Sequence, residues 1–133
     1  MEISASAHAA ALWVGLHLIL LLVLSMLVVR QRRNHGVALG DGGVPQLTQA
    51  VRAFGNATEY VPAGLIAVVA LALVGAPPLV VHAAGMTLLV GRIAHAVGLS
   101  RTGAASLPRA AGVVLTWLAY ILGAVALIFY AIP

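Results

Sequence analysis

The stretch AAALWVGLHLILLLVLSMLVV, residues 9–29, decides the fold class of this chain. It contains no charged residue, and as an α-helix it is about long enough to cross the roughly 30 Å hydrocarbon core of a membrane. Positive charges follow it, at Arg30, Arg32 and Arg33, whereas a cleavable signal peptide carries its positive charges in front. We therefore expect residues 9–29 to form a transmembrane helix rather than a signal peptide.

The overall composition also indicates a membrane protein. Of the 133 residues, 62% are hydrophobic and only 8% are charged, whereas an ordinary soluble domain carries about 25% charged residues. The absence of cysteine excludes disulfides, cysteine nucleophiles and cysteine-based metal sites. The seven basic residues are all arginines at the ends of apolar segments, so membrane topology explains them and no nucleic-acid partner is expected.

Three further apolar runs, residues 47–74, 79–97 and 109–131, predict three more transmembrane helices. The connectors are NHGVALGDGGVPQ, GAPP and SRTGAASLP, which are rich in Gly, Pro and small polar residues. Short connectors between antiparallel helices favour an up-down bundle. We expect residues 1–133 to form one all-α domain, a four-helix up-down transmembrane bundle.

The arginines indicate how the bundle is oriented. All seven lie on or near the side of the first and third connectors, whereas Glu2 and the uncharged GAPP turn lie on the other side. Because arginine accumulates on the cytoplasmic side of membrane proteins, we expect the arginine-rich loops to be cytoplasmic and both termini to be outside. Trp13, Phe129 and Tyr130 fit an aromatic belt at the outer interface.

A polar stripe enters the second apolar run in the segment RAFGNATEYVP, residues 52–62. On a helix, Arg52, Asn56 and Glu59 point within about 60° of one another and rise about 10 Å. A charge at mid-bilayer costs about 3 kcal/mol, so such residues usually face a protein interior or a cavity. Two interpretations remain open. The stripe is either a structural network, with a predicted Glu59–Arg92 ion pair, or a ligand site.

A longer stretch, RNHGVALGDGGVPQLTQAVRAFGNATEYVP from residue 33 to residue 62, together with GRIAHAVGLS and LPRAAGVVLTW, resembles bacterial members of MAPEG, the membrane-associated proteins in eicosanoid and glutathione metabolism. The family includes microsomal glutathione transferases. The resemblance implies four transmembrane helices per subunit, a homotrimer, and glutathione bound between neighbouring subunits near the cytoplasmic face. It also implies a bacterial inner-membrane location.

The resemblance assigns roles to the polar stripe. Arg52, Asn56, Glu59 and Tyr60 match the family's glutathione-binding helix. Arginine is a natural bidentate partner for a carboxylate of glutathione. A glutamate can hold its amine, and an asparagine can both donate to and accept from its peptide groups.

Residues on the other helices match the family as well. Arg92 and His95 match an Arg-x-x-His pattern of the third helix. Arg30 or Arg32 matches an arginine that binds a carboxylate of glutathione. Arg109 is the nearest match to the arginine that activates the thiol. A free thiol is only about 3% ionised at pH 7, and lowering its pKa by about two units corresponds to roughly 2.7 kcal/mol.

The expected function is therefore that of a glutathione-dependent membrane transferase or peroxidase whose thiolate attacks a lipophilic electrophile dissolved in the bilayer. Phe54 and Leu99 stand where some eukaryotic members have Gln and Tyr. These departures leave open a family member that binds without turnover. A small multidrug-type transporter is a second alternative, although that class carries its essential Glu in the first helix. No metal site is expected, because no histidine pair has metal-ligand spacing within one helix.

Overall fold

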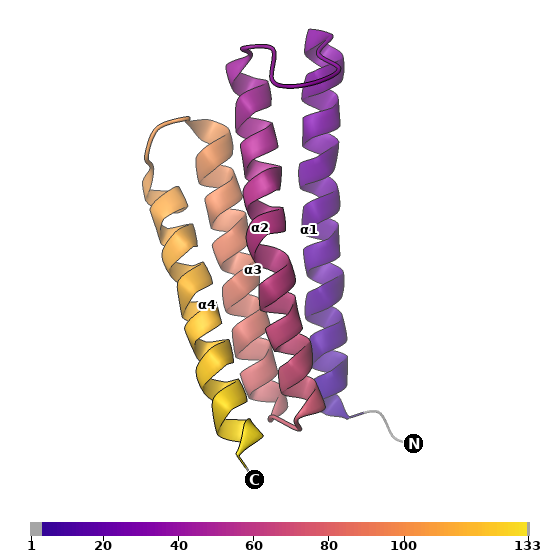
Figure 1. Cartoon of the computed structure of the whole chain (residues 1–133), viewed down its shortest axis with the longest axis vertical. Coiled ribbons are helices and arrows are strands. Elements are labelled where there is room, and N and C mark those ends of the chain that lie inside the picture. The colour runs from indigo at the N-terminus through magenta and orange to yellow at the C-terminus, as the bar shows by residue number, and fades with distance from the viewer. Residues whose placement is uncertain (1–3, 133) are drawn as a thin grey trace.

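Four long helices make up the fold. The computed structural model describes residues 4–132 and contains α1 (Ala5–His35), α2 (Pro45–Leu73), α3 (Pro78–Arg101) and α4 (Leu107–Ala131), which run alternately up and down with both ends of the chain at the same end of the bundle (Figure 1). Each helix is long and apolar enough to cross a membrane. The predicted all-α transmembrane architecture is therefore confirmed.

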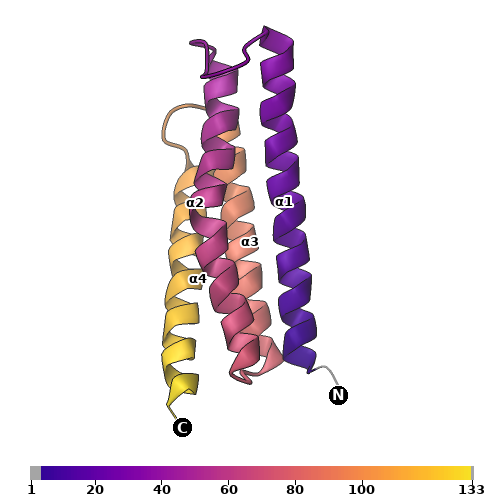
Figure 2. The same ribbon diagram turned by 45° about the vertical axis from the view of Figure 1, so that its right-hand side comes forward.

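The helices do not close into a ring. α2 and α3 form the centre, while α1 and α4 lie on opposite sides of this pair (Figures 1 and 2). Within residues 4–132, α1 and α4 do not contact each other. Their outward faces carry exposed apolar side chains such as Leu18 and Ile121, each 59% exposed. Such faces suit a surrounding of lipid chains or of other apolar helices.

Local sequence signals account for the helix ends. The side chain of Ser4 accepts a hydrogen bond from the backbone N–H of Ala7 and caps α1. Gly36, at φ 65°, ends α1 in the left-handed conformation that glycine adopts most easily. Prolines occupy the first turns of the other three helices, where their missing N–H has no intrahelical partner to lose.

The half of the bundle near the termini is tightly packed through glycine. Trp13 is 8% exposed and lies against Gly85 of α3, where any Cβ would clash with the indole ring. Its Nε1 donates to Nδ1 of His82 at 3.0 Å. Trp13 was predicted to join an aromatic belt at the outer interface, but its ring is buried between α1 and α3, where Gly85 leaves room for it. Phe129, by contrast, is 69% exposed.

Two more contacts close this half. Leu88 of α3 packs on Gly64 of α2, where a Cβ would clash with the leucine methyl groups. The buried hydroxyl of Ser6 donates to the carbonyl of Ala76 at 2.6 Å and ties the start of α1 to the α2–α3 turn. His17 is fully buried, and its Nδ1 donates to the Trp13 carbonyl at 2.7 Å, as a packing histidine would.

Candidate functional site

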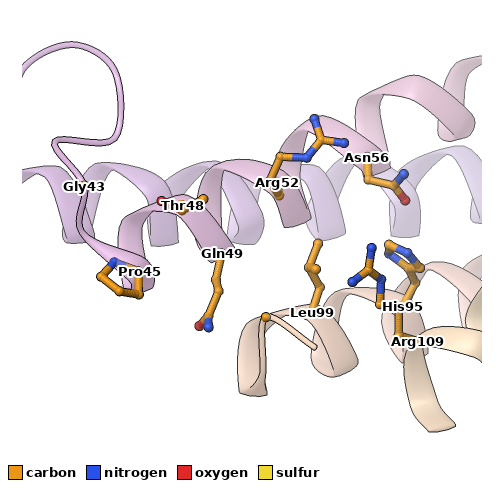
Figure 3. Close-up of a pocket in the computed structure, with 10 residues that line it drawn as sticks. Gly43, Pro45, Thr48, Gln49, Arg52, Asn56, His95, Leu99 and Arg109 are labelled. Atoms are coloured by element: carbon orange, nitrogen blue, oxygen red, sulfur yellow. The ribbon is translucent and has the colours of Figure 1, made fainter. Parts of the chain in front are cut away.

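At the other end of the bundle, a pocket of about 390 Å³ opens between α2, α3 and α4 (Figure 3). This volume lies within the range of about 300–1,000 Å³ that is typical of small-molecule sites. Polar side chains converge on it from the three helices. The lining residues are Gly43, Pro45, Thr48, Gln49, Arg52, Asn56, His95, Leu99, Gly103 and Arg109.

Close contact between α3 and α4 positions one wall of this pocket. A Cβ on Gly98 would clash with the backbone of Arg109, and a Cβ on Gly112 would clash with the backbone of His95. Small residues of this kind let helix backbones approach each other in membranes. The two glycines therefore bring Arg109 and His95 side by side, facing the polar stripe of α2 (Figure 3).

The α1–α2 loop and the end of α3 form the rim. The carboxylate of Asp41 accepts hydrogen bonds from the backbone N–H of Gly43 at 3.1 Å and the hydroxyl of Thr48 at 3.0 Å. These bonds hold the pKa of the Asp41 carboxyl below its usual value. With its amide turned so that both groups are satisfied, Gln49 donates to the Ser100 carbonyl and accepts from the Gly103 N–H, each at 3.3 Å.

The polar stripe forms a chain of contacts in which Asn56 is central. Arg92 donates to Asn56 Oδ1 at 2.9 Å, and Asn56 Nδ2 donates to Glu59 Oε2 at 3.3 Å. Glu59 also lies 3.9 Å from Arg52. The predicted Glu59–Arg92 ion pair is wrong, because within residues 4–132 the only pair closer than 4.0 Å joins Arg52 and Glu59. Asn56 stands between the two groups instead.

Arg92 lies behind the pocket rather than on its wall. It is 2% exposed, its guanidinium lies 5.2 Å from the centre of the Tyr60 ring, and its Nε has no partner within the described chain. The hydroxyl of Tyr120 donates to the Tyr60 carbonyl at 2.6 Å and ties α4 to the same region of α2. Arg92 therefore reaches the pocket through Asn56, whose side-chain Oδ1 accepts from it at 2.9 Å and whose backbone carbonyl accepts at 3.4 Å.

The two positions that depart from the eukaryotic family pattern differ in location. Leu99 lines the pocket and gives it one apolar wall. Phe54 is not among the lining residues and packs instead on the apolar cluster that includes Leu24 and Ala57. Of these two departures, only Leu99 changes the chemistry of the pocket.

The expected carboxylate-binding arginine of α1 is not brought to this pocket within one chain. Arg32 donates to the carbonyls of Val37, Ala38 and Gly40, the last at 2.8 Å, and so holds the α1–α2 loop. Arg30 is exposed and borders a separate hollow on α1. A ligand in the pocket could meet Arg30 only if it came from another subunit.

Several residues that shape the pocket were missed by sequence reasoning. Gly98 and Gly112 are spaced like many other small residues of the chain, and no pattern marks them as the crossing point of α3 and α4. Thr48 follows Asp41 by seven residues, and only the fold of the loop brings them together. The described residues contain no group of three or more His, Cys, Asp or Glu able to hold a metal ion.

Comparison with known proteins agrees with the resemblance. The MAPEG family model matches residues 10–129. The chain is 36% identical over 121 residues to inner membrane protein YecN of Escherichia coli strain K12, and the match covers 91% of both chains. The YecN protein of Escherichia coli O6:H1, strain CFT073, matches to the same extent. The family model covers most of the described chain, and this protein therefore belongs to the MAPEG family.

Proposed function

We propose that this protein binds glutathione in the α2–α3–α4 pocket and transfers it to lipophilic electrophiles, with peroxide reduction as the related activity. The observation that carries the proposal is the convergence of arginines on an open pocket of about 390 Å³. Arg52 and Arg109 line this pocket, and Arg92 lies directly behind Asn56. If these arginines only stabilised the fold, a hollow of this size beside them would not be needed.

Charge supports this ligand. Glu59 compensates one arginine through its 3.9 Å contact with Arg52, which leaves the positive charge of Arg109 on the pocket wall and that of Arg92 behind Asn56 uncompensated. Glutathione carries two carboxylates and one ammonium group at neutral pH, and its thiolate form carries one further negative charge. Arginine binds carboxylates through charge-assisted hydrogen bonds, while Glu59, 53% exposed, can accept the ammonium group.

Arg109 is the residue we assign to thiol activation. It is partly exposed at the start of α4 and forms no hydrogen bond or ion pair with other described residues, so its guanidinium is available to a ligand. A positive charge next to the thiol favours the thiolate. The thiol proton leaves to water, the thiolate sulfur attacks the electrophilic carbon, and with an aryl chloride the chloride leaves as the new C–S bond forms.

The assembly completes the proposal. We propose a homotrimer in which Arg30 of one subunit approaches the pocket of its neighbour. This arginine is exposed, and it does not line the α2–α3–α4 pocket of its own chain. The protein is placed in the bacterial inner membrane, as the name of the YecN relatives states for those proteins. We propose that the arginine-bearing end faces the cytoplasm, where glutathione is available, because arginine accumulates on that side of membrane proteins.

The test is to purify the protein in detergent, to measure glutathione binding by calorimetry, and to measure conjugation of chlorodinitrobenzene. Arg52→Ala and Glu59→Gln should each weaken glutathione binding by about 10- to 100-fold, because a hydrogen bond to a charged group contributes about 1.5–3 kcal/mol. The matched control is Arg101→Ala, which removes an exposed arginine that lines neither this pocket nor the hollow of Arg30 and should leave binding unchanged.

The outcomes separate the alternatives. Binding without conjugation by the unaltered protein would support a family member that binds glutathione or a similar thiol but does not catalyse. Absence of binding, combined with proton-coupled efflux of organic cations from vesicles, would support the transporter. Equal loss of binding in Arg101→Ala and Arg52→Ala would overturn the assignment of the pocket.

A further inference from the structure

A second hollow lies at the arginine-bearing end, in the groove between α1 and α3. Its floor is formed by Leu24 and by Ala96, which are 5% and 6% exposed. Its walls are half-exposed apolar side chains. They are Leu20, Val23 and Leu27 from α1, and Ile93 and Val97 from α3. The small side chain of Ala96 leaves a groove of about 390 Å³ where a larger residue would fill the space between the two helices.

This groove is separate from the glutathione pocket. The helix α3 lies between them, so that Ala96 faces the groove whereas His95 and Leu99 line the pocket. The apolar part of the groove extends along α1 from Leu20 to Leu27, which corresponds to about 10 Å of helix rise. An occupant of the groove would therefore be an elongated apolar group lying along the helices.

The groove is polar at one end only, where Ser100 and Arg101 complete the lining. Arg101 is exposed and is the last residue of α3. The described chain has two carboxylates. Asp41 is bonded within the loop and Glu59 contacts Arg52, so neither pairs with Arg101. The groove thus combines an apolar trough with an uncompensated positive charge at its mouth.

We propose that this groove binds an acidic phospholipid of the membrane, with one acyl chain between α1 and α3 and the phosphate at Arg101. The apolar walls match the acyl chain, and the guanidinium matches the phosphate through charge-assisted hydrogen bonds. A zwitterionic lipid would offer the same chain, but its own cationic group compensates its phosphate. The site should therefore select for the charge of the headgroup.

The test is native mass spectrometry of the detergent-purified protein with phosphatidylglycerol and phosphatidylcholine of identical acyl chains. We expect the protein to retain phosphatidylglycerol about five- to tenfold more strongly than phosphatidylcholine. Arg101→Gln should abolish this preference. Arg33→Gln, which removes an exposed arginine at the same end but outside the groove, should preserve it, and Arg101→Gln should not alter glutathione binding.

Two further variants test the acyl-chain part of the groove. Ala96→Leu fills its floor, and Val23→Trp narrows it from a position that is 47% exposed and so tolerates a larger side chain. Each should lower retention of both lipids. Equal retention of both lipids by the unaltered protein, or equal losses from Arg101→Gln and Arg33→Gln, would overturn the proposal. A changed number of subunits in either groove variant would also overturn it, because the groove would then be a contact between copies.

Discussion

The two halves of the bundle differ in how the space between the helices is filled. Near the termini, side chains fill the room that glycines leave, as Trp13 does at Gly85 and Leu88 does at Gly64. At the arginine-bearing end, glycines bring the backbones of α3 and α4 together, yet hollows remain on both sides of α3. The half near the termini also has an open hollow, of about 750 Å³ between α3 and α4, but apart from Thr87 and Tyr130 its lining is apolar. The hollows at the arginine-bearing end are each lined in part by arginine side chains.

The charged groups of the two halves are distributed differently. Near the termini, Trp13, His82 and Ser6 each have a partner within the chain, the buried Nε2 of His17 has none among the described residues, and no charged side chain of the described residues is involved. At the other end, Arg109 and Arg101 lack such partners within the described residues. Arg109 lines the α2–α3–α4 pocket and Arg101 lines the groove between α1 and α3, so both charges are available to a ligand there. We therefore expect substitutions in the first half to change stability and those in the second half to change binding.

The largest expected effect is that of Trp13→Ala. Removing a buried tryptophan leaves a cavity between α1 and α3 and removes the bond to His82, at a cost of about 3–5 kcal/mol of unfolding free energy. The midpoint of thermal unfolding in detergent should fall strongly, while glutathione affinity of the folded fraction stays unchanged. The matched control is Trp117→Ala, since Trp117 is 56% exposed and should contribute little to packing.

The opposite pattern is expected for Arg109→Ala. The conjugation rate at neutral pH should fall about 25-fold, because the thiolate fraction of bound glutathione returns from roughly three quarters, at a pKa lowered by about two units, to about 3% at the free pKa. Thermal stability should be unchanged. The thiolate absorbance of bound glutathione, followed against pH, measures the pKa directly, and Arg109→Lys should restore part of the shift. An unchanged thiol pKa in Arg109→Ala would remove Arg109 from the catalytic step.

Sequence reasoning reached the fold because the apolar runs are long and the connectors are distinct. The run of residues 9–29 and the GAPP turn locate membrane helices without any knowledge of tertiary contacts. The polar stripe of Arg52, Asn56 and Glu59 was accessible for a similar reason, since helical periodicity alone puts the three side chains on one face.

What the sequence did not reveal depends on how each helix is rotated about its own axis. Trp13 matched an interfacial belt by depth, but only the position of Gly85 on α3 shows that it points inward. Glu59 and Arg92 matched by depth as well, yet the rotation of α2 places Asn56 between them. Arg30 and Arg32 could not be told apart as the arginine that meets a ligand, and only the turn after Gly36 shows that Arg32 donates to loop carbonyls.

A smaller effect than that of Arg109 is expected for Arg92→Gln. Arg92 orients Asn56 by donating to its Oδ1, which directs Nδ2 toward Glu59. Without that bond the amide loses its fixed orientation, and KM for glutathione should rise about tenfold with little change in kcat, which is the scale of one hydrogen bond to a charged group. Arg92→Lys should recover part of the affinity.

A double-mutant cycle distinguishes this positioning role from direct contact with the ligand. If Arg92 acts through Asn56, Arg92→Gln should have almost no further effect in an Asn56→Ala background. Additive losses of affinity would instead mean that Arg92 contacts glutathione independently, and the geometry of the stripe would then have to change on binding.

The smallest expected effect concerns the loop that carries the rim of the pocket. Because the bonds from Gly43 and Thr48 lower the pKa of the Asp41 carboxyl in the folded protein, its stabilisation of the loop is present above the unfolded pKa and is lost as pH falls through the lowered folded pKa. Amide exchange at Gly43, measured relative to the α3–α4 loop, should therefore accelerate in acid. Asp41→Asn should remove this pH dependence, since the asparagine amide does not titrate.

A relative exchange rate that is flat with pH in the unaltered protein would mean that Asp41 does not hold the rim. The shape of the α2–α3–α4 pocket on that side would then rest on Gln49 and its bonds to Ser100 and Gly103.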